Sequence, residues 1–234
     1  MNVFSHNKSL FLHPKKQLRV LCAFLAALFF TLLLCACQKK TDYFNYVSEL
    51  RSNILLDGNA SFSLRVYATV KESPYSADGV PRECNERAEF WLVAPSGDKE
   101  CSLSFDVNGK TYGGEMSYDS VKAEYYYAYP LDISAHTQLS CTVVYDGQTQ
   151  EFNAKTVLSE STLSPENALK CLVAAQAELF TTMTDKYGFA GEIYLRLLYE
   201  DSPYYYIGVI DRNGKTNAFL LNATSGKLLA KRES

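Results

Sequence analysis

The sequence predicts a mainly β protein in which an antiparallel β-sandwich is followed by a small α+β domain. Three observations predict this fold class. Between residues 58 and 157 apolar and polar residues alternate, which is the period of a half-buried strand. Dipeptides that favour tight turns separate the alternating segments. After residue 164 the apolar spacing becomes helical once and then returns to alternation.

A short helix is predicted before the first strand. Asp42 is a favoured N-cap residue, and Gly58 offers a stop. We therefore assign residues 38–57 to a tether and a short helix. The apolar residues at helical spacing are Phe44, Val47, Leu50 and Ile54.

Seven short strands are predicted for the domain at residues 58–157. Asn108-Gly109 and Asp146-Gly147 are strong hairpin signals within it. Seven short antiparallel strands joined by such turns indicate a sandwich of immunoglobulin-like type. The strands are expected near residues 60–70, 88–94, 101–105, 111–118, 121–129, 138–145 and 148–156.

A linker is predicted at residues 158–164, where serine and threonine are frequent and apolar patterning is weak. The second domain, residues 165–234, begins with one amphipathic helix that Ser164 caps and Pro165 starts. Three or four alternating strands follow, with a tight turn at Asn213-Gly214. We expect this helix to cover one face of an antiparallel sheet, and the two domains to fold separately.

Two segments of the second domain resemble the PepSY domain of bacterial exported proteins. "SPENALKCLVAA" is similar to the opening helix of that family, and "YYYIGVIDRNGKTNAFLLNATSGKLL" to its closing strands. This chain has Asn222 where the family usually has an aspartate. The resemblance implies a non-enzymatic domain that restrains exported peptidases.

The first 37 residues predict export and lipid anchoring. Residues 1–19 contain four basic residues and no acidic one, and residues 20–34 are uncharged. This arrangement is typical of a signal peptide. Leu34-Cys35-Ala36-Cys37 resembles the lipobox of bacterial lipoproteins, and this resemblance implies that Cys37 receives the lipid. Bulky Leu34 before Cys35 argues against Cys35 in that role.

The lipobox predicts a location on the outer side of the cell membrane, with palmitate among the acyl chains. Two or more acyl chains suffice for stable anchoring. The alternative is an uncleaved signal anchor, in which Cys22, Cys35 and Cys37 are small apolar residues. Either way the rest of the chain lies on the extracytoplasmic side.

The charge of the remaining chain excludes one class of partner. Residues 1–37 hold four of the 23 basic residues and none of the 26 acidic ones, so the remainder carries 19 against 26, a net charge of −7. An acidic domain has no electrostatic footprint for nucleic acid. The expected partners are therefore the membrane, through the lipid, and a protein of the envelope.

Four cysteines follow the signal segment: Cys84, Cys101, Cys141 and Cys171. Their spacing fits no compact metal site, because zinc ligands come in pairs separated by two to four residues. Cys101 and Cys141 lie on the apolar phase of predicted strands, where a free thiol behaves as a small hydrophobe. Free thiols are the main prediction, with a Cys84–Cys101 or Cys101–Cys141 disulfide as the alternative.

The sequence predicts no catalytic residue, no metal and no cofactor. His136 is the one histidine beyond residue 37, and we expect it in a solvated loop. The nucleophile and metalloprotease motifs Gly-x-Ser-x-Gly and His-Glu-x-x-His are absent. Two Asn-Gly-Lys-Thr stretches lack the earlier glycine of a phosphate-binding loop and are interpreted as hairpin turns.

Tyrosine provides the candidate interaction surface. Consecutive strand residues face opposite sides of a sheet, so part of each tyrosine run points away from the core. Aromatic residues with a polar tip are favoured at protein interfaces, but cross-strand pairing that only stabilises the sheet is an alternative. The candidate residues are Trp91, Tyr126, Tyr204, Tyr205 and Tyr206.

We therefore expect a surface-tethered, non-enzymatic binding or regulatory lipoprotein of the bacterial cell envelope. Its expected partner is an exported peptidase or another envelope protein, as the PepSY resemblance implies. A ligand-binding lipoprotein that serves a transporter is the alternative, together with an architectural envelope domain.

Overall fold

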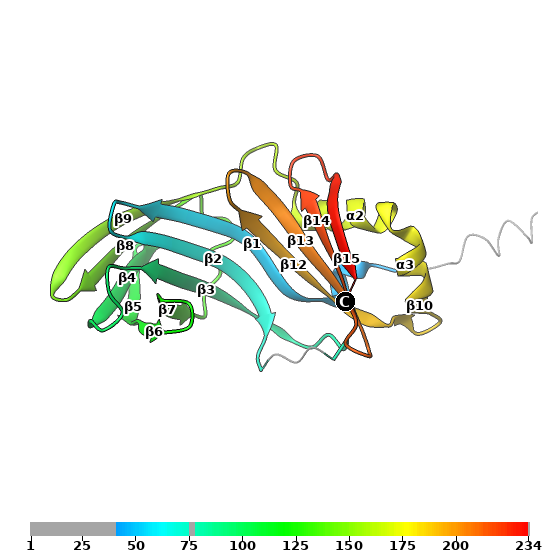
Figure 1. Cartoon of the computed structure of the whole chain (residues 1–234), viewed down its shortest axis with the longest axis horizontal. Helices are drawn as coiled ribbons and strands as arrows, with labels where there is room; N and C mark the ends of the chain where they lie inside the picture. The colour runs from blue at the N-terminus through cyan, green and yellow to red at the C-terminus, as the bar shows by residue number, and fades with distance from the viewer. Residues whose placement is uncertain (1–40, 75–77, 234) are drawn as a thin grey trace, which may run out of the picture. The chain divides into compact units, whose positions relative to one another are not determined.

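The structure is a computed structural model in which residues 41–74 and 78–233 are described (Figure 1). The chain from Asp42 onward forms one compact unit. The predicted signal segment and its lipidation site Cys37 lie outside the described residues. Within the described ranges, no helix is long and apolar enough to cross a membrane.

The described chain is mainly β, as predicted. A curved antiparallel set contains β1 to β9, and a second antiparallel set contains β12 to β15 with two short helices. The elements are η1 (Tyr43–Tyr46), β1 (Val47–Gly58), β2 (Ser63–Glu72), β3 (Cys84–Val93), β4 (Cys101–Val107), β5 (Lys110–Glu115), β6 (Ser117–Asp119), β7 (Glu124–Tyr129), β8 (Gln138–Tyr145), β9 (Gln148–Thr156), α2 (Pro165–Ala175), α3 (Ala177–Thr182), β10 (Thr184–Asp185), β11 (Gly188–Phe189), β12 (Gly191–Tyr199), β13 (Pro203–Asp211), β14 (Thr216–Asn222) and β15 (Leu228–Glu233).

Strand β1 shows that the short helix predicted within residues 38–57 is wrong. Helical structure is confined here to the 3-10 turn η1, where Asp42 accepts a hydrogen bond from the Phe44 N–H at 3.1 Å. The neighbours Ile54 and Leu55 in β1 are both buried. A strand that is buried on both faces has no clean alternation, so its pattern can also match a helix.

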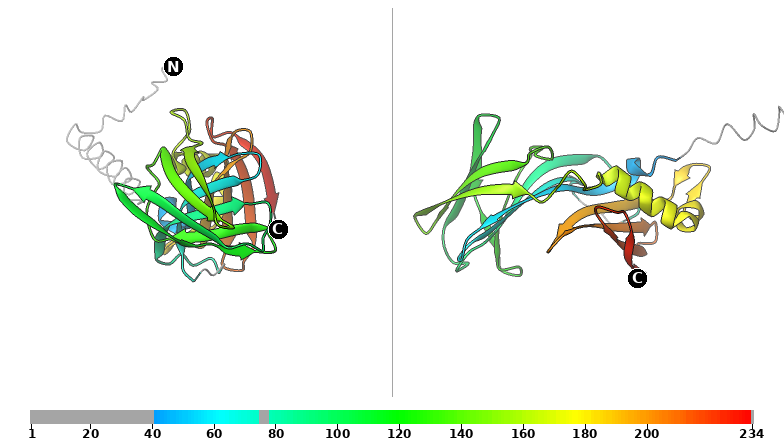
Figure 2. Two further views of the ribbon diagram at one scale, coloured as in Figure 1. Left: turned by 90° about the vertical axis from the view of Figure 1, so that its left-hand side faces the viewer. Right: turned by 90° about the horizontal axis from the view of Figure 1, so that it is seen from above.

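The same strand connects the two strand sets. β1 pairs with β2 in antiparallel fashion, with β12 in parallel fashion through residues 47–51, and with β9 through Leu55 and Leu56. The strands of the first set run β6-β7-β3-β2-β1-β9-β8-β4-β5 and form a near-closed barrel (Figure 2, left). The predicted sandwich has two separate sheets, whereas here β1 is hydrogen-bonded on both sides and joins them.

The barrel has nine strands and not seven partly because the predicted strand at residues 111–118 is divided at Met116. The Met116 N–H donates to the Cys101 carbonyl at 2.9 Å, and the side chain is buried in the barrel. Before Met116 the chain pairs with β4 as β5, and after it with β7 as β6. The change of partner at this residue brings the two ends of the barrel sheet together in sequence.

The two hairpin turns predicted at residues 108–109 and 146–147 are confirmed. Asn108 and Gly109 have φ values of 54° and 76°, and Asp146 and Gly147 have 50° and 75°. Both dipeptides therefore adopt the left-handed conformation that a two-residue hairpin requires. The β4–β5 and β8–β9 hairpins close at these positions.

In the second set the predicted single helix is two short helices. Ser164 caps α2 as predicted, and its Oγ accepts from the Asn167 N–H at 3.3 Å. Gln176, with φ −124° and ψ 37°, ends α2 and precedes α3. The break directs Phe180 into the core beside Tyr43, with ring centroids 4.8 Å apart. The helices lie along one side of the strands (Figure 2, right).

Two apolar cores follow from this arrangement. One fills the barrel, and the other contains side chains of α2, α3, β12, β13 and β14. Leu55 of β1 belongs to the barrel core, whereas its neighbour Ile54 belongs to the second core. The first strand of the chain thus stabilises both parts, because successive strand residues face opposite sides.

All four cysteines in the described part of the chain are free, so the predicted thiols are confirmed and the disulfide alternatives are wrong. Cys101 and Cys141 are buried in the barrel, whereas Cys84 and Cys171 are half-buried. Burial raises the pKa of Cys101 to about 11 and that of Cys141 to about 12. The thiolate is the reactive form, so these two thiols are inert near neutral pH.

Candidate functional site

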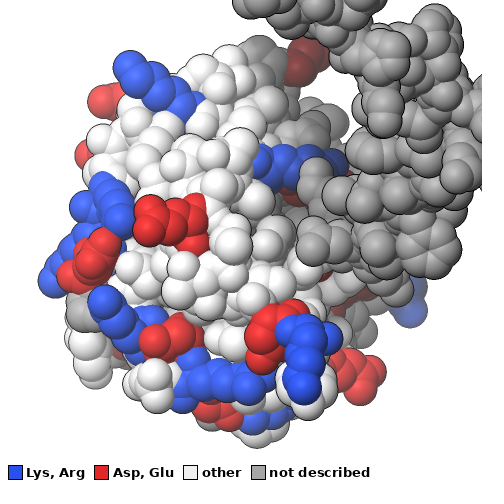
Figure 3. Space-filling model, turned by 90° about the vertical axis from the view of Figure 1, so that its right-hand side faces the viewer, with Lys and Arg blue, Asp and Glu red and all other residues white. Residues whose placement is uncertain are grey.

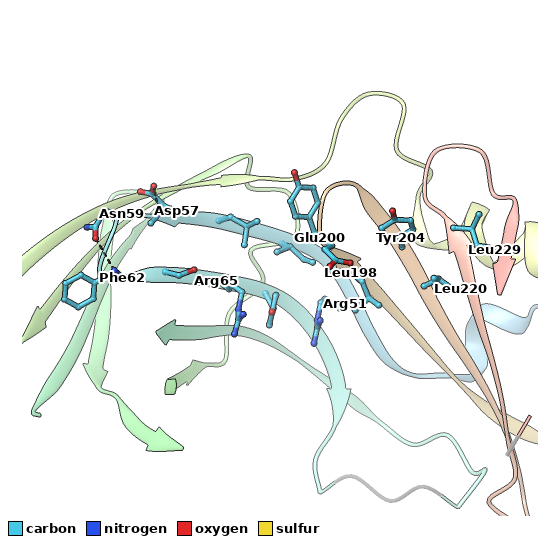
Figure 4. A pocket seen from close by; sticks show the side chains of 16 residues that line it. Arg51, Asp57, Asn59, Phe62, Arg65, Leu198, Glu200, Tyr204, Leu220 and Leu229 are labelled. Carbon is cyan, nitrogen blue, oxygen red and sulfur yellow. Dashed lines mark hydrogen bonds between the residues drawn. The ribbon is translucent and has the colours of Figure 1, made fainter. Parts of the chain in front are cut away.

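The strands of both sets border an open groove of about 1100 Å³. Its walls come from β1 and β2 on one side and from the ends of β12 to β15 on the other (Figure 4). The volume slightly exceeds the range of about 300–1,000 Å³ that is usual for small-ligand pockets. We call this hollow the groove.

The groove lies where β1 changes its pairing partner. Residues 47–51 pair with β12, whereas Leu55 and Leu56 pair with β9. The pairing of β1 with β2 also shifts register between Arg51 and Asn53, and such a bulge re-aims side chains. Beyond Arg51, β1 and β12 are no longer hydrogen-bonded, and side chains of the two strand sets border the same space.

One face of the second strand set contributes the apolar wall. Leu197, Tyr205 and Leu221 are in register and buried on the helix-covered face. Leu198, one residue on from Leu197, lies on the opposite face and lines the groove. None of the described helices packs there, and the other lining residues of this set are Tyr199, Glu200, Tyr204, Leu220 and Leu229.

The charged side chains around the groove are largely paired. Arg65 contacts Glu124 at 2.6 Å, and Lys71 pairs with Glu89. Arg196 on β12 donates from Nε to Glu49 at 2.9 Å and from a terminal nitrogen at 2.5 Å. The lining carboxylate Asp57 accepts from the backbone N–H groups of Gly58 and Asn153, at 2.8 and 2.5 Å.

Arg51 differs from these neighbours. Its guanidinium carbon lies 4.0 Å from the centre of the Tyr67 ring, and among the described residues it has no carboxylate partner. Its buried Nε atom has no hydrogen-bond partner there. Burial lowers the pKa of Arg51 and the nearby Arg196 also lowers it, although Tyr67, Glu49 and Glu89 act in the opposite direction. The groove therefore contains a partly desolvated cation whose charge is unmatched.

Two predicted surface residues, Trp91 and Tyr126, lie together beside the groove. Their ring centroids are 4.4 Å apart, and the Lys122 ammonium lies 3.8 Å from the Trp91 ring centre. Trp91 pairs in register with Arg65, which lines the groove. The Tyr126 hydroxyl donates to Glu89 at 3.3 Å, and burial together with Glu89 raises its pKa to about 12.

The tyrosine run of β13 is divided between the two faces of the sheet. Tyr204 lines the groove, and Tyr206 lies on the same face, with the Arg196 guanidinium 6.0 Å from its ring centre. Tyr205 is a correction to the predicted surface. It is fully buried in the second core, donates to the Leu163 carbonyl at 2.7 Å, and has a pKa raised to about 12 by burial.

Sequence reasoning missed Arg51 and the leucines of the groove. Arg51 is in the segment predicted to be helical, so its strand face was not assigned. Leu198 and Leu220 follow the alternation of their strands, but that alternation does not say which face the helices cover. A signal was present in the sequence, because apolar and aromatic residues occupy both faces of β12 and β13. Such a pattern indicates that the face not covered by helices is also apolar.

Two buried carboxylates lie at the other end of β12, outside the groove. Glu192 is fully buried, and its Oε1 accepts from the Gly79 N–H at 3.2 Å. Glu72 is also buried, and its Oε1 accepts from the Arg82 N–H at 2.6 Å. The first contact ties the loop after β2 to the second strand set, and the second ties that loop to the end of β2. In the described ranges no group of three or more His, Cys, Asp and Glu residues could hold a metal ion.

Figure 3 shows the charged side chains at the helix-bearing end of the molecule. Blue and red side chains are interspersed there among the described residues around a largely uncharged centre. A surface of mixed sign does not produce a strong field that would steer a charged ligand. The groove is therefore the candidate functional site.

Comparison of the chain with protein-family models, with curated proteins and with solved structures finds no match. The PepSY resemblance and the lipobox therefore stay predictions from the sequence.

Proposed function

We propose that the protein is a non-enzymatic binding protein that is tethered to the bacterial cell envelope and holds a segment of a partner protein in the groove. The observation that carries the proposal is the groove-facing side of β12 to β15. The helices cover the other face of these strands, whereas this face exposes leucine and tyrosine side chains beside an unmatched arginine. Partly exposed aromatic and apolar residues with arginine are the composition of a binding surface.

The groove's chemistry favours binding over catalysis. Of its two carboxylates, Asp57 accepts from two backbone N–H groups, and of its two guanidinium groups, that of Arg65 is paired with Glu124. General acid–base catalysis needs a group that is free to exchange a proton at the reacting atom. Paired side chains of this kind instead hold the shape of a surface.

The tether and the type of partner follow from the sequence predictions. Lipid on Cys37 would place the groove beside the outer face of the cell membrane. The PepSY-like second domain favours an exported peptidase or another envelope protein as the partner. A ligand-binding lipoprotein of a transporter, or an architectural domain, is the alternative.

Site-specific photo-crosslinking in intact cells tests the binding role. A photoreactive amino acid at Tyr204 or Leu229 should give a discrete crosslinked band, because both residues line the groove. The same amino acid at Tyr187, which is 83% exposed and not among the residues that line the groove, is the matched control. Equal crosslinking at all three positions, or none, would contradict the proposal.

Metabolic labelling tests the tether separately. Cys37→Ser should abolish palmitate incorporation and leave unprocessed precursor, whereas Cys35→Ser should do neither. Labelling that persists in the Cys37 variant would show that the lipobox assignment is wrong and favour the uncleaved anchor.

A further inference from the structure

Of the two basic residues that line the groove, one has no carboxylate partner among the described residues. Arg65, Lys71 and Arg196 each have a carboxylate partner, whereas Arg51 has none among the described residues. The lining carboxylate Asp57 is occupied by backbone donors. An unmatched guanidinium that is partly removed from water is stabilised by an incoming anion.

Glu200 is the other acidic residue of the groove lining, and its position does not cancel this charge. It is exposed in the turn between β12 and β13, while Arg51 is half-buried over Tyr67. The described contacts include no ion pair between Arg51 and Glu200. Charges that water separates attract each other weakly, so Glu200 leaves Arg51 available.

We infer that the groove takes an extended protein segment that brings a carboxylate to Arg51, either an acidic side chain or a terminal carboxylate. This inference rests on the proposed function and names the chemistry of the partner. Guanidinium groups present a planar fork that matches a carboxylate in a two-bond geometry. The leucine side of the groove receives the apolar side chains that flank this acid.

The lining favours a peptide over a fatty acid, which would also join a carboxylate to apolar groups. Polar residues such as Ser63 and Tyr199 are interspersed with the leucines. An alkyl chain would leave these groups without partners, and an unmade hydrogen bond is costly. The amide groups of a peptide can satisfy them. Arg51 is also a single cation, whereas a nucleic acid carries a phosphate at every step.

Selection from a library of random dodecapeptides tests the inference. The full-length chain is held in lipid nanodiscs, and the same selection is run with Arg51→Gln. We expect the wild-type protein to enrich peptides with an acidic residue, or a free terminal carboxylate, next to apolar residues. We expect Arg51→Gln to lose this preference. Arg82→Gln is the matched control, because Arg82 does not line the groove and is already paired with Asp78.

A selected peptide then allows a double-mutant cycle. Glu→Gln in the peptide, or amidation of its terminus, should weaken binding to the wild type roughly 10- to 100-fold. The same change should have little effect on binding to Arg51→Gln, because the partner charge is already gone. Because the substitution is made in the peptide, the wild-type protein is unaltered. The loss of affinity measured with the wild type therefore does not depend on whether a protein variant folds. Arg51→Lys should recover part of the affinity, since it keeps the charge without the fork.

The outcomes are distinct. Peptides that bind without an acid, or whose acid matters equally in wild type and Arg51→Gln, would overturn the inference and leave the proposed function standing. Failure to enrich any peptide would overturn both. Oleate that displaces the selected peptide and binds more tightly would identify a lipid-binding groove instead. A dimer in nanodisc-free detergent that Arg51→Gln dissociates would identify a second copy of the chain as the occupant.

Discussion

The barrel and the helix-covered strand set bury their sheets in different ways. The barrel curves until its own strands enclose the core, so its interior face needs no other element. The strands β12 to β14 bury one face beneath α2 and α3, and their other face borders the groove. A sheet with one covered and one uncovered face keeps a surface available for binding, which the barrel interior does not.

The largest expected effects come from the centre of each core. Phe90→Ala in the barrel and Phe219→Ala in the second core should each lower the free energy of unfolding by about 3–5 kcal/mol, because both rings are buried. Since β1 contributes to both cores, we expect a single transition in denaturant for each variant. Two transitions, with one unaffected by each substitution, would instead support the separately folding domains that the linker at residues 158–164 predicts.

The shared strand allows a sharper comparison between adjacent residues. Ile54→Ala should weaken the second core and Leu55→Ala the barrel core, each by about 2–5 kcal/mol, since both side chains are buried. Val144→Ala is the control, because Val144 is exposed on β8 and should change stability by less than about 0.5 kcal/mol. Hydrogen exchange should show that Ile54→Ala first loses amide protection in the second strand set, whereas Leu55→Ala first loses it in the barrel. Identical exchange patterns would mean that the two cores behave as one.

The loop contact between the strand sets should have a smaller effect. Glu192→Ala leaves the Gly79 N–H without its acceptor and should cost about 1–3 kcal/mol. Glu192→Gln keeps an acceptor oxygen and removes a buried charge, so its stability should equal or exceed that of the wild type. Thermal melting of both variants checks this. A Gln variant as unstable as the Ala variant would show that the charge itself is required.

The barrel thiols should make stability depend on alkaline pH. The folded pKa of Cys141 is about 12, raised from 9.0, so below pH 9 the thiol is protonated in both states and its full contribution is present. Between pH 9 and 12 the unfolded chain loses this proton first, and stability falls by up to about 1.4 kcal/mol per pH unit for this group. Unfolding in urea at several pH values measures the slope. Cys141→Ala should reduce the slope, whereas an unchanged slope would assign the effect to Cys101 or to buried tyrosines.

The smallest effect is expected at the rim of the groove. Lys122→Ala removes the contact of the ammonium with the Trp91 ring and should cost about 0.5–1 kcal/mol, because exposed cation–π contacts are weak. Binding of a selected peptide in the groove should be unaffected. A loss of peptide affinity would extend the binding surface to Trp91 and Tyr126.

Local sequence determined the parts of the fold that depend on neighbouring residues. The Asn108-Gly109 turn follows from the left-handed conformations that these residues tolerate, and the Ser164 cap follows from a side chain that bonds the next backbone turn. The strands of the second set lie close to their predicted positions, although only β14 alternates cleanly between buried and half-buried residues. The same patterns indicated the buried positions of Cys101 and Cys141.

The tertiary structure decided what depends on distant partners. β1 is a strand because three other strands pair with it, and Met116 divides a strand because the chain changes its pairing partner there. Tyr205 is buried, whereas Tyr204 lines the groove and Tyr206 lies on the same sheet face, because the helices cover the other side. Arg51 became a candidate binding residue because of tertiary packing as well. Its sequence context predicted a helix, and only the pairing of β1 and the packing of both strand sets around it place Arg51 in a strand without an ion-pair partner.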